Sequence, residues 1–142
     1  MKNKPIFNWD KDIGMASCIL QDGNKTFVGI AQCHPDDMDM MSEKTGCEIA
    51  FTRARIKIFQ ARRDEIKTRL SALNDFYHMI NHSKYYVETA YENKMLKKYM
   101  NSLQADLELT KQLIEDERKH LTEYIDLKEN FYKRIRSNRK QE

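Results

Sequence analysis

The sequence predicts an α+β protein, with an N-terminal β-hairpin head followed by a long antiparallel helical hairpin of coiled-coil type, assembled into an oligomer. Three observations support this class: a hairpin turn signal at Asp22-Gly23, a long hydrophobic repeat after residue 49, and a shortage of turn formers. Only four Gly and two Pro occur among 142 residues, which predicts few but long elements. The expected division is a head with an acidic joint over 1–48 and a helical hairpin over 49–142.

Residues 13–32 are predicted to form the β-hairpin. Asp22-Gly23 favours a two-residue type I′ turn, in which both central residues have positive φ. This register pairs Leu20 with Lys25, Cys18 with Phe27, and Ala16 with Gly29. Because two strands alone are only marginally stable, the hairpin must lie on a helix or pair with strands of another copy.

The segment after the hairpin is predicted to be a turn that leads into the first helix. Pro35 cannot continue a strand ladder, so it ends the second strand. Asp36, Asp37 or Ser42 is expected to cap the helix that follows, because short polar side chains accept hydrogen bonds from the first helical N–H groups.

Two helices, over about 42–81 and 84–137, are predicted from hydrophobic positions that recur about every 3.5 residues. The stripe of the first helix is at 49, 52, 56, 59, 63, 66, 70, 73, 77 and 80. The stripe of the second is at 96, 100, 103, 107, 110, 114, 117, 121, 124, 128, 131 and 135. The sequence Asn81-His82-Ser83 interrupts the pattern, and Ser83 is a suitable N-cap for the second helix. So short a break favours antiparallel helices.

The apolar stripe of the second helix is wider than a two-helix seam needs. Tyr99, Leu109 and Leu113 lie beside the repeat positions. One hairpin cannot bury all of this surface, so the sequence predicts a homo-oligomer.

Charge and composition indicate a protein of the cytoplasm. Residues 1–48 carry five Lys against eight acids, and residues 49–142 carry twenty Lys and Arg against fourteen acids. An acidic head on a basic shaft is therefore expected. No apolar run is long enough to span a membrane, the N-terminus does not have the pattern of a signal peptide, and three scattered cysteines do not form a disulfide framework.

We expect no metal, no cofactor and no catalysis. A zinc site from Cys18, Cys33, Cys47 and His34 would lack the paired short spacing of such sites. A cation site from Asp36, Asp37, Asp39 and Glu43 competes with the commoner role of acids before a helix. His78 and His82 lack the Glu of a zinc-protease motif, and no phosphate loop or nucleophile elbow occurs. Packing cysteines and capping acids are the favoured interpretation.

The basic residues at the two ends of the helical hairpin are the candidate ligand-binding residues. In an antiparallel hairpin the start of the first helix and the end of the second lie together. Guanidinium forks there would bind phosphate oxygens while aromatic rings stack on a base. The candidates are Arg53, Arg55, Arg134, Arg136, Phe51 and Tyr132. The alternative is that most of these charges only keep long helices soluble.

The spacing Gly29-x-Ala31-x-Cys33-x-Pro35-x-Asp37, followed by Gly46-x-x-Ile49-Ala50-x-x-Arg53-Ala54, resembles a block in small proteins of phages and prophages of Gram-positive bacteria. The resemblance covers residues 29–54 only, and "MDMM" stands where an aromatic residue is expected. It implies an accessory phage protein that acts on host machinery.

The predicted function is that of a non-enzymatic phage accessory or anti-defence protein in the host cytoplasm. It would sequester an anionic, nucleotide-type signal or block a host defence protein, with copies of itself as further partners. The alternatives are a nucleic-acid-binding accessory protein and a coiled-coil scaffold or virion component.

Overall fold

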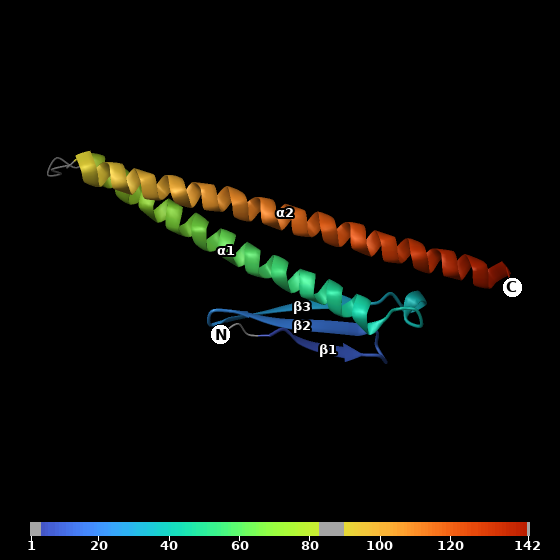
Figure 1. Cartoon of the computed structure of the whole chain (residues 1–142). Helices are drawn as coiled ribbons and strands as arrows, with labels where there is room; N and C mark the ends of the chain where they lie inside the picture. The colour runs from blue at the N-terminus through green and yellow to red at the C-terminus, as the bar shows by residue number, and fades with distance from the viewer. Residues whose placement is uncertain (1–3, 83–89, 142) are drawn as a thin grey trace. The chain divides into compact units, whose positions relative to one another are not determined.

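The computed structural model describes residues 4–82 and 90–141, with side chains for 4–80 and 93–140, and confirms the α+β class. A three-stranded antiparallel sheet is followed by two long helices (Figure 1). The elements are β1 (Ile6–Asp10), β2 (Met15–Asp22), β3 (Lys25–Gln32), the short 3₁₀ helix η1 (Pro35–Asp37), α1 (Glu43–His82) and α2 (Ala90–Gln141).

The chain forms two compact units, and both helices contribute to each of them. The first unit is Met1–Ile58 together with Glu115–Glu142, and it holds the sheet, the start of α1 and the end of α2. The second unit is Phe59–Ile114, which holds the remaining helical residues.

The head contains one strand more than the predicted hairpin. β1 pairs with β2 from Ile6–Ile19 to Asp10–Met15, so β2 is the central strand. Because a two-stranded hairpin is marginal in water, the third strand and the helix together supply the missing support. Its only local signal is the alternation of Phe7 and Trp9 with the polar Asn8 and Asp10.

The predicted turn was placed one residue too early, so the predicted strand pairing was wrong by two residues. Gly23 and Asn24 occupy the central positions, so that Asp22 pairs with Lys25. Gly23 has φ of +64°, and no described residue other than glycine has positive φ. This is the pattern of a type II′ turn, which needs Gly at its first central position, rather than of type I′. The observed pairs are Leu20 with Phe27, Cys18 with Gly29 and Ala16 with Ala31.

Ser42, one of the three predicted candidates, is the N-cap of α1. Its Oγ accepts a hydrogen bond from the Thr45 backbone N–H at 3.1 Å. Asp36 lies within η1 instead, where its backbone N–H donates to His34 Nδ1 at 3.2 Å. Asp37 pairs with a side chain from α2 instead, as described below.

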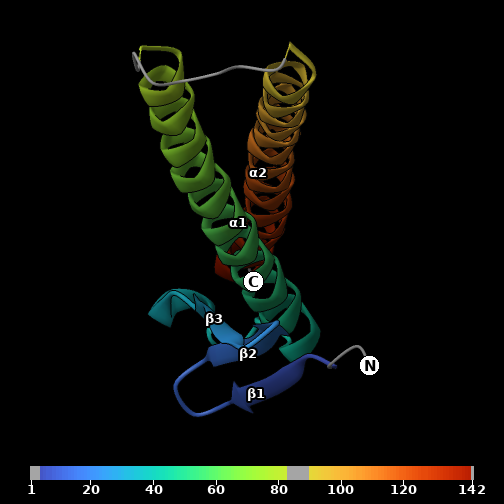
Figure 2. The same ribbon diagram turned by 90° about the vertical axis from the view of Figure 1, so that its left-hand side faces the viewer.

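The start of α1 lies very close to β3 at Gly29, on one face of the sheet (Figure 2). A Cβ atom on Gly29 would be 1.9 Å from the Ala50 carbonyl oxygen and 2.6 Å from the Ala54 nitrogen. Ala50 and Ala54 are fully buried at this contact. The core around it is completed by Ala16, Cys18, Leu20, Ala31 and Ile49. Small side chains on both elements therefore set how closely the helix approaches the sheet.

The predicted helical stripes are the buried sides of both helices. None of the ten stripe positions in α1 is exposed, and Phe131 is the one exposed position among the twelve in α2. Leu103, Leu107 and Ile114 are the buried residues of this stripe within the second unit. α1 ends at His82 and α2 extends to Gln141, whereas the proposed Ser83 cap lies outside the described residues.

Replacing Gly29 with Ala should destabilise the protein by about 2 kcal/mol or more, because the new methyl group meets backbone atoms that no rotamer change can move away. Urea denaturation followed by circular dichroism measures this. Thr26→Ala, at an exposed position of the same strand, should change the free energy of unfolding by no more than about 0.5 kcal/mol. Equal stability of the two variants would contradict the close helix–sheet contact.

Candidate functional site

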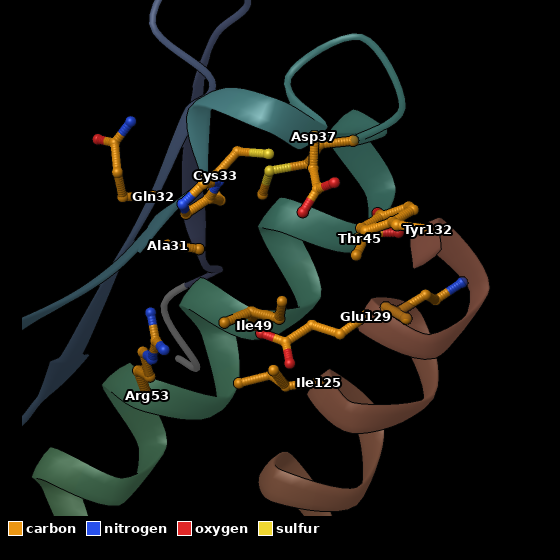
Figure 3. A pocket seen from close by; sticks show the side chains of 13 residues that line it. Ala31, Gln32, Cys33, Asp37, Thr45, Ile49, Arg53, Ile125, Glu129 and Tyr132 are labelled. Atoms are coloured by element: carbon orange, nitrogen blue, oxygen red, sulfur yellow. The ribbon is translucent and has the colours of Figure 1, made fainter. Parts of the chain in front are cut away.

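A cavity of about 160 Å³ lies in the first unit, where the end of β3, η1, the start of α1 and the end of α2 meet. Figure 3 shows that side chains from all four elements surround it. We call it the joint cavity. Its lining residues are Ala31, Gln32, Cys33, His34, Asp37, Met41, Thr45, Ile49, Arg53, Ile125, Lys128, Glu129 and Tyr132.

Asp37 is the most constrained polar group of the joint cavity. The residue is only 8% exposed, and its carboxylate points into the cavity in Figure 3. Arg136 Nη1 lies 2.7 Å from Asp37 Oδ1, which makes a close ion pair. The N–H direction is nevertheless poor, because Oδ1 has no hydrogen bond of acceptable geometry. The charge of Asp37 is therefore compensated, while one of its buried oxygens can still accept a hydrogen bond.

A second ion pair joins the same two segments at the surface. Arg139 Nη1 donates to Asp39 Oδ2 at 2.6 Å. This hydrogen bond, reinforced by the positive charge of Arg139, holds the pKa of Asp39 below its ordinary value of 3.8. The acids of the joint thus fix the end of α2, whereas the sequence had predicted that they cap α1.

Two further groups of the joint cavity are buried and remain protonated at neutral pH. Burial, followed by the neighbouring Cys33 and Asp37, raises the pKa of the Tyr132 hydroxyl. Burial and the charges of Asp37 and Asp39 raise the pKa of the Cys33 thiol. Since the thiolate is the reactive form of cysteine, Cys33 is a packing residue here rather than a nucleophile.

Arg53 and Lys57 reach from α1 to the edge of β3. Arg53 Nη1 donates to the Ile30 carbonyl at 2.7 Å, and Lys57 Nζ donates to the Val28 carbonyl at 2.6 Å. These carbonyls belong to the side of β3 that no other strand covers. Arg53 also lines the joint cavity, and its partner is a neutral carbonyl, so its positive charge is not cancelled by an acid within the described residues.

The other predicted ligand residues do not gather in the joint cavity. Arg55 pairs with Glu117 at 3.2 Å and lies over the Phe51 ring at 5.7 Å. Phe51 in turn contacts Phe7, with ring centroids 6.3 Å apart. Arg134 is exposed on α2. Of the six predicted residues, Arg53 and Tyr132 line the cavity, and Arg136 reaches it through Asp37.

Sequence reasoning missed Lys128 and Glu129 as cavity residues. Lys128 had been placed in the apolar stripe of the second helix, where a charged residue is itself a signal that a polar cavity lies nearby. Its Nζ lies 5.6 Å from the centre of the Tyr124 ring. The lining carries the positive charges of Lys128 and Arg53 and the negative charges of Glu129 and Asp37. Because Arg136 pairs with Asp37, the cavity has a slight excess of positive charge.

Metal and disulfide chemistry find no support among the described residues. No group of three or more His, Cys, Asp or Glu side chains in that part of the chain is arranged to hold a metal ion. Cys18, Cys33 and Cys47 are free thiols. The side chain of His82, one of the two histidines considered for zinc, lies outside the described set. Over the described residues, neither helix is long and apolar enough to cross a membrane.

The second candidate site is the side of the sheet that α1 does not cover, which we call the outer face. Strand alternation assigns it eleven side chains: Ile6, Asn8, Asp10, Met15, Ser17, Ile19, Gln21, Thr26, Val28, Ile30 and Gln32. Ile6, Ile19 and Val28 form one cross-strand row, and Ile30 lies in the next. Ile6 is 59% exposed and Ile30 is 48% exposed. Asp10 is the one charged residue among the eleven, in a chain that is 33% charged.

The fold and these sites define a small α+β protein with an uncovered apolar sheet face and a small polar cavity. No family model, no curated protein and no solved structure matches the chain. The resemblance over 29–54 therefore stays a prediction. Gly29, Ala50 and Ala54 of that block form the close helix–sheet contact, whereas its Ala31, Cys33, Asp37, Ile49 and Arg53 line the joint cavity.

Arg136 and Arg134 should differ in their contribution to stability, although both were predicted to bind a ligand. Arg136→Gln leaves the buried Asp37 carboxylate without its cation, which should cost about 1–3 kcal/mol. Arg134→Gln, at an exposed position, should change the free energy of unfolding by no more than about 0.5 kcal/mol. Urea denaturation of both variants compares them directly. Equal effects would mean that the Arg136–Asp37 pair does not hold the end of α2.

Proposed function

We propose that the chain is a non-enzymatic binding protein that acts as a homo-oligomer and blocks a partner protein by covering part of its surface. The observation that carries this proposal is the exposed, charge-depleted outer face of the sheet. The resemblance over 29–54 makes a host defence protein, met in the host cytoplasm by a phage accessory protein, the preferred partner.

The outer face has the chemistry of an interface core. Interface centres differ from ordinary protein surface chiefly in having few charged residues. Exposed apolar side chains that adjoin one another across strands are also uncommon on the surface of a monomer unless they bind something. The row Ile6–Ile19–Val28 with Ile30 beside it meets both criteria.

The homo-oligomer is supported by apolar residues on α2 outside its buried stripe. Leu109 is 62% exposed, and Tyr99 and Leu113 are exposed as well. These three residues are the ones that widened the predicted stripe. Burying them against another copy would remove this apolar surface from water.

The pairing of several arginines with acidic side chains favours a protein partner over a nucleic acid. A nucleic-acid interface needs an open surface of cations whose counterions are released on binding. Arg55, Arg136 and Arg139 are instead paired with Glu117, Asp37 and Asp39. Nucleic-acid binding and a purely structural scaffold therefore remain the less supported alternatives.

A second candidate ligand, an anion of nucleotide type, is favoured by Arg53. This guanidinium and the Tyr132 ring both line the joint cavity, and the guanidinium has no acidic partner in the described residues. At about 160 Å³, the joint cavity is smaller than the roughly 300–1,000 Å³ typical of ligand pockets. The cavity of one chain would thus hold a phosphate or a sugar rather than a whole nucleotide.

Affinity capture from host lysate tests the protein-blocking function. Ile30→Asp places a charge in the middle of the outer face and should abolish capture, whereas Asn24→Asp adds the same charge at the turn beyond that face and should leave it intact. The captured protein, once purified, should bind the parent chain at least tenfold more tightly than the Ile30→Asp variant in calorimetry. Equal binding to both variants would exclude the outer face as the docking surface.

Native mass spectrometry with adenosine monophosphate and cyclic di-AMP tests the anion candidate. Retention of either nucleotide should be lost in Arg53→Gln and kept in Arg134→Gln, because only Arg53 lines the cavity. As a control, circular dichroism should show that the Arg53→Gln variant is folded, so that loss of the nucleotide reports on binding. Retention that is unchanged in Arg53→Gln, or absent from the parent, would contradict this candidate.

A further inference from the structure

We infer that β1 is the strand through which two copies of this chain meet, giving a two-fold dimer with one continuous six-stranded antiparallel sheet. The inference rests on the homo-oligomer in the proposed function and specifies one contact between copies, separate from the exposed apolar residues of α2. β1 lies at one edge of the sheet, beyond β2 from β3, as both views show (Figures 1 and 2).

The two edge strands of the sheet differ in how far they are blocked from pairing with another strand. An exposed strand edge offers unpaired backbone groups to any other strand, and proteins commonly block such edges. The edge of β3 is blocked because Arg53 and Lys57 donate to the Ile30 and Val28 carbonyls. No described residue outside β2 hydrogen-bonds to the backbone of β1 within the strand. Side chains of α1 therefore close the edge of β3, whereas the described residues leave the edge of β1 available.

The hydrogen-bonding pattern shows which groups of β1 face outward. In an antiparallel ladder, successive residues direct their N–H and C=O groups alternately toward the two neighbouring strands. Val28 and Ile30 direct theirs away from β2, so their partners Ile19 and Ser17 direct theirs toward β1. Ile6, Asn8 and Asp10 consequently bond to β2. Phe7 and Trp9 are left with outward N–H and C=O groups.

One register satisfies these outward groups on both copies. With the two-fold axis at Asn8, Phe7 of each copy lies opposite Trp9 of the other, and each pair exchanges two backbone hydrogen bonds. Moving the axis to Phe7 would place Pro5, which has no N–H, opposite Trp9. Moving it to Trp9 would place Lys11, which follows the end of β1, opposite Phe7. The register centred on Asn8 pairs all five residues of the strand.

Side chains at this edge are compatible with the same register. Phe7 lies on the helix side of the sheet, where it contacts Phe51, yet it is still 44% exposed. Trp9 of the second copy would lie against it as a cross-strand aromatic pair, which stabilises sheets. Beyond the strand ends, Lys4 would lie opposite Asp12 of the second copy, with opposite charge.

Dimerisation at β1 leaves the outer face free and extends it. The two outer faces become one surface of twice the width, because the joined strands form a single sheet. A partner protein would then meet two symmetric copies of the Ile6–Ile19–Val28 row. This arrangement explains why the apolar face and the unprotected edge belong to the same sheet.

A disulfide across the two-fold axis tests the register. Asn8 would face its own copy in a non-hydrogen-bonded pair, with Cα atoms about 4.5 Å apart, which suits a disulfide. Asn8→Cys in the full chain should therefore give a covalent dimer on mild oxidation, seen by non-reducing electrophoresis. The parent chain and Asn24→Cys, whose new thiol lies at the β2–β3 turn, should remain monomeric on the gel.

A second pair of variants tests the hydrogen bonds themselves. Phe7→Pro removes an outward N–H without removing a bond to β2, whereas Phe7→Ala loses the ring but keeps the N–H. In sedimentation experiments, the dimer of Phe7→Pro should dissociate at a concentration at least tenfold higher than that of Phe7→Ala. Circular dichroism confirms that both variants are folded.

The outcomes separate this inference from the proposed function. A parent chain that is oligomeric in sedimentation but does not crosslink through Asn8→Cys would overturn the β1 interface and leave the homo-oligomer standing. A parent chain that is monomeric at about 100 µM, a concentration well above a micromolar Kd, would overturn both. Loss of capture in Ile30→Asp concerns the outer face alone, because that substitution does not alter the edge of β1.

Discussion

The rest of the first unit depends on one close contact, in which the backbone of α1 lies directly against β3. Gly29 has no room for a side chain, and Ala50 and Ala54 are completely buried opposite it. Small residues permit this approach, and the approach then allows α1 side chains to reach the edge of the sheet. The hydrogen bonds from Arg53 and Lys57 to the Ile30 and Val28 carbonyls follow from it.

Electrostatic pairing places the end of α2 against the joint between β3 and α1. The acids that precede α1 carry negative charge, and the last turns of α2 carry positive charge, at opposite ends of the sequence. Arg136–Asp37 and Arg139–Asp39 bring these segments together. The joint cavity exists because these chain segments meet there. Basic residues that suggested a ligand site in the sequence thus serve first to complete the fold.

Two sides of the sheet, its outer face and the edge of β1, are not covered by any described residue, and the proposed interactions are placed there. Its outer face carries apolar side chains with a single charge among eleven residues, and β1 has outward backbone groups without partners in the described chain. α1 covers the opposite face of the sheet, and its Arg53 and Lys57 side chains occupy the edge of β3. This asymmetry is the basis for the proposal that the protein assembles with itself and binds a partner.

Elements with local and periodic signals could be predicted from the sequence. These include the two helices, their buried stripes and the end of the second strand before Pro35, whereas Ser42 was only one of three candidate caps until the structure selected it. The exact turn was missed because Asp22-Gly23 and Gly23-Asn24 are both acceptable turn pairs. Only tertiary structure decided that β1 joins the sheet, that Asp37 and Asp39 pair with α2, and that Lys128 lines a cavity. These features depend on contacts between residues far apart in the chain, and local signals such as the alternation in β1 or the charge of Lys128 in an apolar stripe do not show which segments meet.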